Sequence, residues 1–388
     1  MPTRHLVLGG GMTGHAAAAA IREADPGADI AMLAAEPDRP YARPPLSKGL
    51  WLGKPEQEVF LPEVAGLTLH ASCRAVEIDL AGRSVRDDRG QRHPYDRLLL
   101  ATGGVPRRLP GDGEQILYYR TLADYRRLRA VAGRSVAVIG GGFIGSEVAA
   151  ALARNGKDVT MVFPEEAIGA RAYPRDLATF VTRTFEENGV RVLQGRTVAA
   201  VEARGERTLV RTSGGEEVVA DAVVAGVGIR PDTALAEAAG IRCRDGIEVD
   251  ERLETSAPGV FAAGDVARFP CLPLGERIRV EHEDAALTMG RAAGRNMAGR
   301  DEPYRHLPFF YSDLFDLGYE AVGKLDAALE TVAGWKTPFR EGVVYYLEGD
   351  RVRGVLLWGI FGQVEAARRL VAGEQPIRRE SLSEAIRV

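Results

Sequence analysis

The chain has 388 residues, of which 45% are hydrophobic and 27% charged, and its formal net charge is -4. This length predicts two or three domains, and the small net charge gives no reason to expect nucleic acid or an anionic membrane as a partner. No apolar run approaches the ~18 residues of a membrane-spanning helix, so no transmembrane segment is expected. An apolar strand begins within a few residues of the N-terminus, which leaves no room for a signal peptide, and we expect a cytoplasmic location.

Two glycine-rich turns stand far apart in the chain, and each follows a short apolar run. Residues 9–14 read Gly-Gly-Gly-Met-Thr-Gly, and residues 140–145 read Gly-Gly-Gly-Phe-Ile-Gly. Both match G-x-G-x-x-G between a strand and a helix, the context that indicates a dinucleotide site. The first glycine permits the bend, the second lets backbone N–H groups approach a pyrophosphate, and the third lets the helix pack on the strand. Two such turns predict two dinucleotides, with electrons passing from one to the other. The candidate contacts at these turns are Gly9, Gly11, Met12, Thr13, Gly14, Gly140, Gly142, Phe143, Ile144 and Gly145.

An acidic residue follows the second strand of each of these two units. Glu36 lies about 20 residues beyond the first turn, and Glu165 follows the strand expected near residues 159–163. A carboxylate in this place can accept from both ribose hydroxyls and repel a 2′-phosphate, which favours NADH over NADPH. Arg171 lies close enough in sequence to leave that preference open. Each acid by itself could instead be a solvated carboxylate at a strand end.

The order of these patterns predicts one split domain with a second domain inserted into it. After residue 240 the chain returns to a strand and a helix, and from residue 307 it changes to a hairpin followed by a helix. We therefore expect an α/β fold with two Rossmann-like nucleotide-binding domains of the three-layer ββα type, plus a C-terminal α+β domain. The expected ranges are 1–112 with 241–306 for the split domain, 113–240 for the inserted domain and 307–388 for the C-terminal domain.

Three charged residues outside the turns are candidate functional groups. Asp265 follows Gly264 at the end of an apolar run, where its carboxylate can bind a polyol hydroxyl or else cap a helix. Lys48 follows two prolines that stiffen the backbone, and Glu147 lies on the helix of the second turn. A buried lysine requires a partner. We expect Lys48 and Glu147 to pair beside the reacting ring, and the alternative is that both are surface charges.

The three cysteines are isolated in the sequence. Cys73, Cys243 and Cys271 form no C-x-x-C or C-x-x-x-x-C pair. We expect no redox role for them and no metal site. Electrons must then leave without a dithiol.

Longer strings carry a resemblance to a known group of enzymes. The chain resembles the flavoprotein pyridine-nucleotide oxidoreductase superfamily over nearly its whole length. Within it, the chain is similar to the branch that holds apoptosis-inducing factor and the ferredoxin, rubredoxin and putidaredoxin reductases. The strings that carry this are Pro-Tyr-Ala-Arg-Pro-Pro-Leu-Ser-Lys at 40–48, the second turn to Glu147, Ala-Gly-Asp at 263–265, Arg-Val-Glu-His at 279–282, Phe-Tyr-Ser-Asp-Leu at 310–314 and Gly-Tyr-Glu-Ala-Val-Gly at 318–323.

The resemblance implies FAD in the split domain, NADH in the inserted domain, and an FAD-dependent NAD(P)H oxidoreductase that prefers NADH. By matching motif positions, it implies contacts to FAD from Arg43, Lys48, Val76, Arg120, Asp265, Glu281 and His282. It implies contacts to NAD from Phe143, Glu147, Glu165, Gly228, Glu281, His282 and Glu320. Further candidate cofactor contacts are Ala101, Thr102, Gly103, Gly264 and Tyr311.

The chemistry expected from this resemblance is hydride transfer from nicotinamide C4 of NADH to flavin N5, with the rings held about 3–3.5 Å apart. The candidate catalytic residues are Lys48, Glu147, His282 and Tyr311. Lys48 would act near N5, and a helix N-terminus near His282 would stabilise negative charge on the reduced ring. Tyr311 stands where the family usually has a tryptophan.

Electrons are then expected to pass from the flavin directly to a small electron-transfer protein such as ferredoxin or rubredoxin, or to a quinone. The alternative is a redox-responsive protein like apoptosis-inducing factor, with slow NADH oxidase activity and NADH-dependent oligomerisation; a homodimer is left open. The link between Val332 and Gly342 is short where that factor carries a long insertion, so regulation through the insertion should be absent. A third interpretation is an FAD-linked oxidase of small sulfur or amine substrates, which the second turn and Glu165 argue against.

Overall fold

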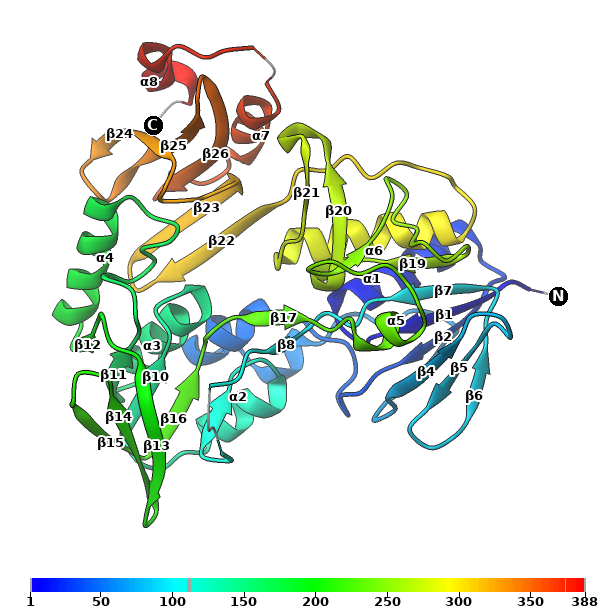
Figure 1. Cartoon of the computed structure of the whole chain (residues 1–388), viewed down its shortest axis with the longest axis horizontal. Helices are drawn as coiled ribbons and strands as arrows, with labels where there is room; N and C mark the ends of the chain where they lie inside the picture. The colour runs from blue at the N-terminus through cyan, green and yellow to red at the C-terminus, as the bar shows by residue number, and fades with distance from the viewer. Residues whose placement is uncertain (1, 110–112, 374, 387–388) are drawn as a thin grey trace. The chain divides into compact units, whose positions relative to one another are not determined.

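A computed structural model describes residues 2–109, 113–373 and 375–386, and these fold into two compact units (Figure 1). The first unit comprises Met1–Arg43, Pro55–Val105 and Arg230–Pro308, and the second comprises Pro44–Lys54, Pro106–Ile229 and Phe309–Val388. The C-terminal residues thus group with the segment predicted to bind NAD. The predicted domain boundary at residue 112 lies outside the described residues, and the three cofactor-based ranges stay predictions.

The first unit is built on a five-stranded parallel sheet in which β1 lies at the centre. In spatial order its strands are β19 (Val260–Ala262), β7 (Arg97–Leu100), β1 (Arg4–Leu8), β2 (Asp29–Leu33) and β3 (Leu67–His70). The strands β1, β7 and β19 are almost wholly buried, as expected for a parallel sheet covered on both faces, whereas the edge strand β3 has no fully buried residue.

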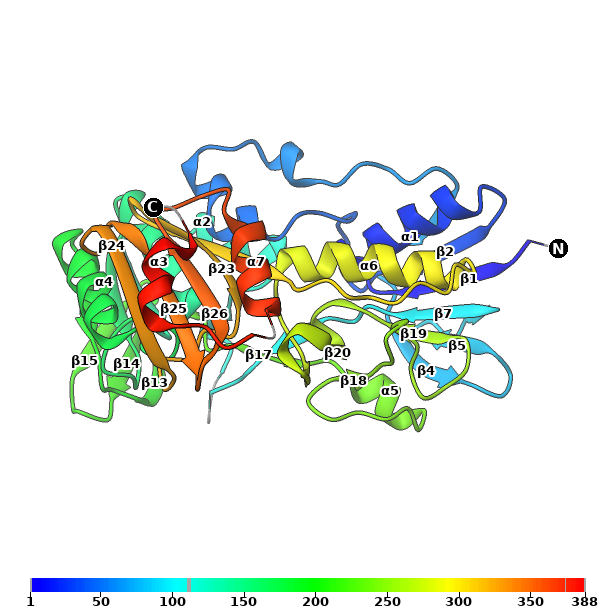
Figure 2. The same cartoon turned by 90° about the horizontal axis from the view of Figure 1, so that it is seen from above.

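Two helices cover one face of this sheet, and a small antiparallel sheet covers the other (Figure 2). The helices α1 (Met12–Ala24) and α6 (Glu283–Met297) pack closely, because Gly290 and Gly294 bring their backbone against that of α1. The antiparallel sheet consists of β4 (Ala75–Asp79), β5 (Ser84–Asp87) and β6 (Arg92–Pro94). The three layers are those predicted for a nucleotide-binding domain of the ββα type.

The second unit repeats this plan on another parallel sheet, with β10 at its centre. In spatial order the strands are β12 (Arg191–Leu193), β11 (Asp158–Val162), β10 (Ser135–Ile139), β16 (Ala222–Ala225) and β9 (Ile116–Tyr118). The helices are α2 (Leu122–Arg129), α3 (Phe143–Arg154) and α4 (Arg175–Glu187). Val210 and Val218 of the antiparallel sheet share one buried core with Ile139 and Val223. That sheet consists of β13 (Val198–Arg204), β14 (Arg207–Thr212) and β15 (Glu217–Ala220).

The C-terminal part of the second unit is a five-stranded antiparallel sheet. Its strands, in spatial order, are β22 (Phe309–Leu314), β23 (Leu317–Gly323), β26 (Arg351–Trp358), β25 (Glu341–Glu348) and β24 (Glu330–Thr337). The helices α7 (Val364–Ala372) and α8 (Leu382–Ala385) follow. The hairpin and helix predicted for this region are confirmed, and so is the short link, since only residues 338–340 join β24 to β25.

The remaining elements of the described residues are short. They are α5 (Ala234–Ala238), the two-stranded sheet of β8 (Gly104–Pro106) and β17 (Ile229–Pro231), and the three-stranded sheet of β18 (Ile247–Glu248), β20 (Ala267–Cys271) and β21 (Glu276–Ile278). Within the residues that the structure describes, no helix combines the length and the apolar character needed to cross a membrane.

Each parallel sheet reverses its strand order at the strand that leads into a glycine turn. β1 lies between β2 and β7, and β10 lies between β11 and β16. In open α/β sheets ligands bind outside the carboxyl ends of the strands at such a reversal. The fold therefore supplies two candidate sites, one in each unit.

Candidate functional site

The first glycine turn is a tight bend whose shape only glycine permits. Gly9 has a φ of +123°, and a Cβ on it would lie 2.1 Å from the carbonyl oxygen of Ala101. A Cβ on Gly14 would lie 2.0 Å from the carbonyl oxygen of Gly9, so this glycine lets α1 begin directly against the strand. A Cβ on Gly11 would meet no atom within 4 Å. The turn is thus open at the helix N-terminus, where the N–H groups of α1 can receive a phosphate.

The second turn repeats this geometry position by position. Gly140 has a φ of +113°, and a Cβ on Gly145 would lie 2.1 Å from the Gly140 carbonyl oxygen. The open position is Gly142, whose Cβ would again meet nothing within 4 Å. The backbone angles at the two helix starts agree, with φ and ψ of -83° and -173° at Gly11 and of -84° and -171° at Gly142. Both turns therefore fit a pyrophosphate.

Glu36, the acid of the first turn, is held by two neighbours. Arg43 Nη2 lies 2.6 Å from its Oε1, and the Tyr41 hydroxyl donates to its Oε2 at 2.5 Å. The backbone N–H of Arg43 also reaches the sulfur of Met12, at 3.4 Å. The predicted Arg43, Glu36 and Met12 are thereby brought together within the first unit. Tyr41, which the sequence pattern did not single out, orients the carboxylate.

The turn after β19 brings the Asp265 segment against the first glycine turn. Gly264 has a φ of +75°, and a Cβ on it would lie 2.3 Å from the Thr13 hydroxyl oxygen. Asp265 lies in the 3-10 turn Gly264–Val266. The backbone carbonyl of Asp265 accepts from Arg279, which also pairs with Glu281 at 2.9 Å. The residues predicted to bind FAD at 264, 265 and 281 are therefore connected in one segment of the first unit.

His282 is the N-cap residue of α6, and its side chain is partly buried. Burial lowers the pKa of this imidazole to about 4, so the ring is neutral near pH 7. Any positive potential at this place comes from the N–H groups at the start of α6 and not from an imidazolium.

The strand end at Ala101 completes the first unit's site region. Ala101, Thr102 and Gly103 follow β7, and Gly103 has a φ of +68°. The Thr102 hydroxyl donates to the carbonyl of Asp232 at 2.8 Å. These contacts fix the backbone beside Gly9, so the predicted segment can border the same ligand as the glycine turn.

Glu165, the acid of the second turn, lies at the rim of a cavity of about 800 Å³ in the second unit. Its Oε1 lies 2.6 Å from Arg171 Nη2, and the arginine is 85% exposed. The cavity is also lined by Tyr173, Arg175 and Gln194. The carboxylate is thus positioned to accept from hydroxyl groups, with an arginine beside it whose exposed guanidinium can also move.

Lys48 and Glu147 form the ion pair that the sequence predicted. Lys48 Nζ lies 2.6 Å from Glu147 Oε2, and the two side chains are 16% and 3% exposed. Two serines complete the surroundings of the carboxylate: Ser47 donates to Oε2 at 2.6 Å, and Ser312 donates to Oε1 at 2.5 Å. Lys48 Nζ also lies 5.3 Å from the ring centroid of Tyr311. A buried carboxylate with three donors is fixed in position and presents the lysine in a defined place.

The segment that carries Lys48 is anchored to the second unit by Trp51. Its indole N–H donates to the Leu46 carbonyl at 2.9 Å, and the Tyr119 hydroxyl donates to the same carbonyl. Asn155 donates to the Trp51 carbonyl at 3.0 Å. Pro44 and Pro45 lie four and three residues before Lys48, and their fixed φ angles limit the freedom of the chain to withdraw the lysine.

A row of hydroxyl groups extends from Glu147 to the cavity of Glu165. Ser312 shares a hydrogen bond with Tyr319, and the Tyr173 hydroxyl donates to that of Tyr319 at 3.0 Å. Burial raises the pKa of both tyrosines, so they stay protonated donors. Sequence reasoning missed Ser312, Tyr319 and Tyr173, because their roles depend on contacts with residues more than 140 positions apart.

The remaining residues predicted to contact a cofactor lie at several separate places in the two units. Val76 lies on β4 and is 41% exposed, Arg120 precedes α2, and Gly228 has a φ of +84° beside Arg107. Glu320 of β23 accepts from the backbone N–H of Gly362. Phe143 and Ile144 begin α3 and are exposed, as positions at the mouth of the second turn would be. Their roles toward a cofactor stay predictions.

Two open glycine turns, each with an acid held by an arginine, define a protein that binds two dinucleotides in one chain. Residues 3–290 match the pyridine nucleotide-disulphide oxidoreductase family. Residues 293–338 and 335–373 match the C-terminal family of apoptosis-inducing factor, mitochondrion-associated. The chain belongs to the pyridine nucleotide-disulphide oxidoreductase family, and the predicted resemblance is confirmed. It is an FAD-dependent NAD(P)H oxidoreductase.

Individual relatives extend the similarity over the whole chain. The ferredoxin–NAD(+) reductase component of the anthranilate 1,2-dioxygenase system of Burkholderia cepacia is 36% identical over 380 residues, which cover 95% of this chain and 93% of that protein. Apoptosis-inducing factor 1, mitochondrial, of Dictyostelium discoideum is 32% identical over 421 residues, covering 96% and 79%. The crystal structure of the ferredoxin reductase for the CYP199A2 system of Rhodopseudomonas palustris superposes with a TM-score of 0.91 at 29% identity, covering 98% and 97%. This agreement confirms the predicted fold class.

Proposed function

We propose that the chain passes electrons from NADH through FAD to a small iron–sulfur protein of the ferredoxin kind. The observation that carries this proposal is the repetition in the two units. Each has a turn with an open second glycine and a glutamate paired with an arginine 2.6 Å away. A protein that used a single dinucleotide would have no need of the second set, so the repetition favours an oxidoreductase over an oxidase of small sulfur or amine substrates.

The residues of the first unit would hold FAD. The N–H groups of α1 next to Gly11 would receive the pyrophosphate, and Glu36, oriented by Arg43, would accept from the ribose. Asp265 would bind the polyol chain, and the start of α6 would favour negative charge near His282. FAD, when bound, supplies a ring that accepts the hydride of NADH and releases electrons to the acceptor.

The residues of the second unit would hold NADH and order Lys48. Glu165 would accept from the adenosine ribose, and the N–H groups at Gly142 would receive the phosphates. Lys48 would place a positive charge and a hydrogen-bond donor beside the reacting ring, and Glu147 would keep that ammonium charged and oriented. Neither residue needs to carry a proton for hydride transfer, so both act through charge and position.

The acceptor follows from the cysteines and from the relatives. The sequence has no cysteine pair through which a dithiol route could run. The relative from Burkholderia cepacia is named as the reductase of a ferredoxin, and the superposed structure from Rhodopseudomonas palustris is a ferredoxin reductase. A ferredoxin is therefore the acceptor we favour over rubredoxin or a quinone.

Anaerobic turnover tests this proposal. The yellow holoenzyme would first be titrated with NADH under argon, and we expect the flavin absorbance to bleach with one equivalent. A [2Fe–2S] ferredoxin, a rubredoxin and a soluble benzoquinone would then be offered at equal concentration, with the reduction of each followed at its own wavelength. We expect the ferredoxin to be reduced with the highest kcat/KM. A flavin that NADH fails to bleach, or a quinone that is preferred to every iron–sulfur protein, would contradict the proposal.

The C-terminal match to apoptosis-inducing factor favours a second candidate function. In it, NADH reduces the flavin, slow reoxidation keeps it reduced, and the reduced protein changes its oligomeric state. The match is broken into two stretches that meet at residues 335–338, where β24 turns into β25. Only residues 338–340 join the two strands there, without the long insertion expected for apoptosis-inducing factor, and we rank this function second.

The cytoplasmic location and the homodimer considered from the sequence stay predictions. Cell fractionation with an antibody against the chain would check the first. Mass photometry of the purified holoenzyme would check the second.

A further inference from the structure

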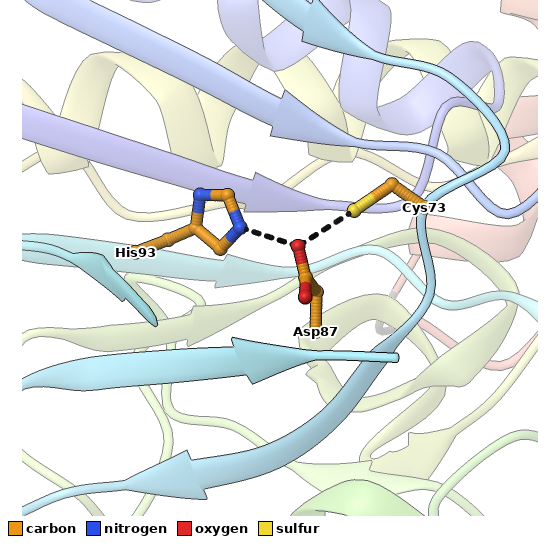
Figure 3. Close-up of side chains that lie close together, drawn as sticks. All are labelled: Cys73, Asp87 and His93. Atoms are coloured by element: carbon orange, nitrogen blue, oxygen red, sulfur yellow. Dashed lines mark hydrogen bonds and ion pairs between the residues drawn. The ribbon is translucent and has the colours of Figure 1, made fainter. Parts of the chain in front are cut away.

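A cluster of three polar side chains lies in the small antiparallel sheet of the first unit, apart from the residues assigned above (Figure 3). It consists of Cys73, Asp87 and His93, all of which are buried. Asp87 is the last residue of β5, His93 lies in the middle of β6, and Cys73 precedes β4. The backbone register pairs His93 with Val85, a fully buried residue. The cluster therefore occupies core positions of the sheet, which apolar side chains would ordinarily fill.

The donor atoms of these side chains converge on one point. Asp87 Oδ2 lies 2.9 Å from His93 Nε2 and 3.3 Å from Cys73 Sγ, and all three donor atoms lie within 4.8 Å of one another. The other carboxylate oxygen, Oδ1, accepts from the backbone N–H groups of Arg89 at 2.9 Å and Gln91 at 2.8 Å. These two backbone bonds turn Oδ2 toward the cysteine and the histidine, as outer hydrogen bonds orient the ligands of a metal.

We propose that Cys73, Asp87 and His93 bind a divalent transition-metal ion of the zinc class. Thiolate, carboxylate and imidazole are all zinc ligands, with bonds of about 2.0–2.3 Å, and donor atoms within 4.8 Å of one another can surround one ion after local side-chain adjustment. On binding, the thiol proton leaves to solvent, and the histidine binds through Nε2 as a neutral imidazole that carries its single proton on Nδ1, so that the ion lies between the three donor atoms.

The charge of such a site suits its burial. A thiolate and a carboxylate together balance a divalent cation, and the neutral imidazole adds no charge, so the buried group is neutral as a whole. Calcium and magnesium would not fit, because they prefer oxygen ligands only. Thiolate and imidazole together favour zinc.

A fourth side chain, a partly buried histidine, borders the cluster. The ring of His70, which is half-buried, lies 5.0 Å from the ring of His93 in an edge-on arrangement. Since a tetrahedral zinc site has four ligands, a water molecule would be the fourth ligand beside these three side chains.

The position of the cluster connects it to the segment that carries Glu36. The backbone N–H of Cys73 donates to the Ala34 carbonyl at 2.9 Å, and that of Ser72 donates to the Glu36 carbonyl at 3.1 Å. A bound ion would hold Cys73 against β5 and β6, and through these two backbone bonds it would brace the chain beyond β2. We therefore expect the bound ion to raise the stability of the first unit.

Metal titration of the holoenzyme tests the proposal. After treatment with a chelator and gel filtration, the protein would be titrated with Zn²⁺ by calorimetry, and bound metal would be counted by mass spectrometry. Co²⁺ provides a second signal, because its d–d bands in a four-coordinate site with a thiolate lie at longer wavelengths than the absorption of oxidised flavin. We expect one ion per chain and a higher melting temperature with Zn²⁺.

Matched variants assign the binding to this cluster. Cys73→Ser and His93→Gln should each weaken Zn²⁺ binding at least tenfold and remove the cobalt bands. Cys243→Ser, which changes a half-buried thiol outside the cluster, should bind as the wild type does. Failure of the wild type to bind one equivalent would overturn the proposal, and so would equal binding by Cys73→Ser. If a cluster variant does not fold, the stoichiometry and melting temperature of the wild type decide the question.

Discussion

At the scale of single residues, Glu147 shows how a buried charged side chain is held in one position by its partners. Its side chain is 3% exposed, and its carboxylate pairs with Lys48 and accepts hydrogen bonds from Ser47 and Ser312. A buried carboxylate without these partners would be strongly unfavourable, whereas three charge-assisted contacts compensate its loss of solvent. The same contacts remove the rotational freedom of Lys48, so its ammonium group is preorganised for whatever binds beside it.

Replacement of Lys48 by methionine tests the role of this charge. Lys48→Met keeps the length of the side chain but removes the ammonium group and leaves Glu147 without its cation. A charged hydrogen bond contributes about 1.5–3 kcal/mol, so we expect flavin reduction by NADH to slow roughly tenfold to a hundredfold in anaerobic stopped flow. Lys54→Met, in the same segment but exposed, is the control and should reduce at the wild-type rate. Unchanged kinetics in Lys48→Met would remove the lysine from the mechanism.

Glu165 decides the choice between NADH and NADPH in our proposal. Glu165→Ser would remove the carboxylate that repels a 2′-phosphate and would leave Arg171 free to pair with it. We expect kcat/KM for NADPH to rise about tenfold or more, and that for NADH to fall. NADPH gains a charged contact of about 1.4 kcal/mol or more with the arginine, and NADH loses its contact with the carboxylate. The neighbouring Glu166, which is 86% exposed, provides the control Glu166→Ser. A ratio that stays the same in Glu165→Ser would show that other groups select the dinucleotide.

His5 is a buried imidazole away from both glycine turns. Its two ring nitrogens have no hydrogen-bond partner among the described residues, and burial lowers its pKa. The unfolded chain therefore binds a proton near pH 6.5 that the folded chain does not, so stability is lost as the pH falls below about 6.5.

The variant His5→Leu should remove this pH dependence. We expect it to be as stable as the wild type or more stable at pH 7.5, because two buried polar atoms without partners are lost. Between pH 6.5 and 5.5 it should lose up to about 1.4 kcal/mol less than the wild type. Urea unfolding at both pH values measures the difference, with the less buried His15→Gln as control. A parallel loss in His5→Leu and wild type would contradict the assignment.

At the scale of elements, the two strand–turn–helix units allow a paired experiment. A Cβ on Gly14 or on Gly145 would lie about as close to the carbonyl oxygen of the first glycine of its turn, at 2.0 Å and 2.1 Å. Both substitutions by alanine must push the helix away from the strand and close the phosphate site. The cofactor that is lost then reports which site each turn serves.

We expect Gly14→Ala to be purified without yellow flavin, and Gly145→Ala to retain flavin that dithionite reduces but NADH does not. Gly142→Ala separates folding from binding, because its Cβ meets no atom within 4 Å and should leave stability unchanged. It should nonetheless weaken NADH binding, since the methyl group lies where the phosphates approach. The visible spectrum before and after NADH measures all three variants. Loss of flavin from Gly145→Ala would reverse the assignment of cofactors to turns.

At the scale of the whole molecule, the reductase and the redox-responsive protein differ in assembly. The short turn from β24 to β25 lacks the insertion expected for regulation of the second kind. We therefore predict that NADH bleaches the flavin without changing the oligomeric state. Mass photometry of the oxidised and the NADH-reduced holoenzyme, under anaerobic conditions, measures this directly. A shift of mass on reduction would favour the second function.

The amino-acid sequence by itself determined the features that depend on a few neighbouring residues. The two glycine turns, the strand-end acids Glu36 and Glu165, and the strands and helices around them follow from steric needs and periodicity over short stretches. The Lys48–Glu147 pair was also predicted, because a lysine beside two prolines and an acid on the turn's helix each required a partner.

Only the tertiary structure decided the contacts between distant residues. Ser312 reaches Glu147 across 165 positions, and no periodicity relates the two. Cys73, Asp87 and His93 stand too far apart for a metal motif, and they meet because β5 and β6 pair in one register and Cys73 enters the same sheet. Hydrogen bonds of this kind depend on how whole elements pack, which local patterns do not encode.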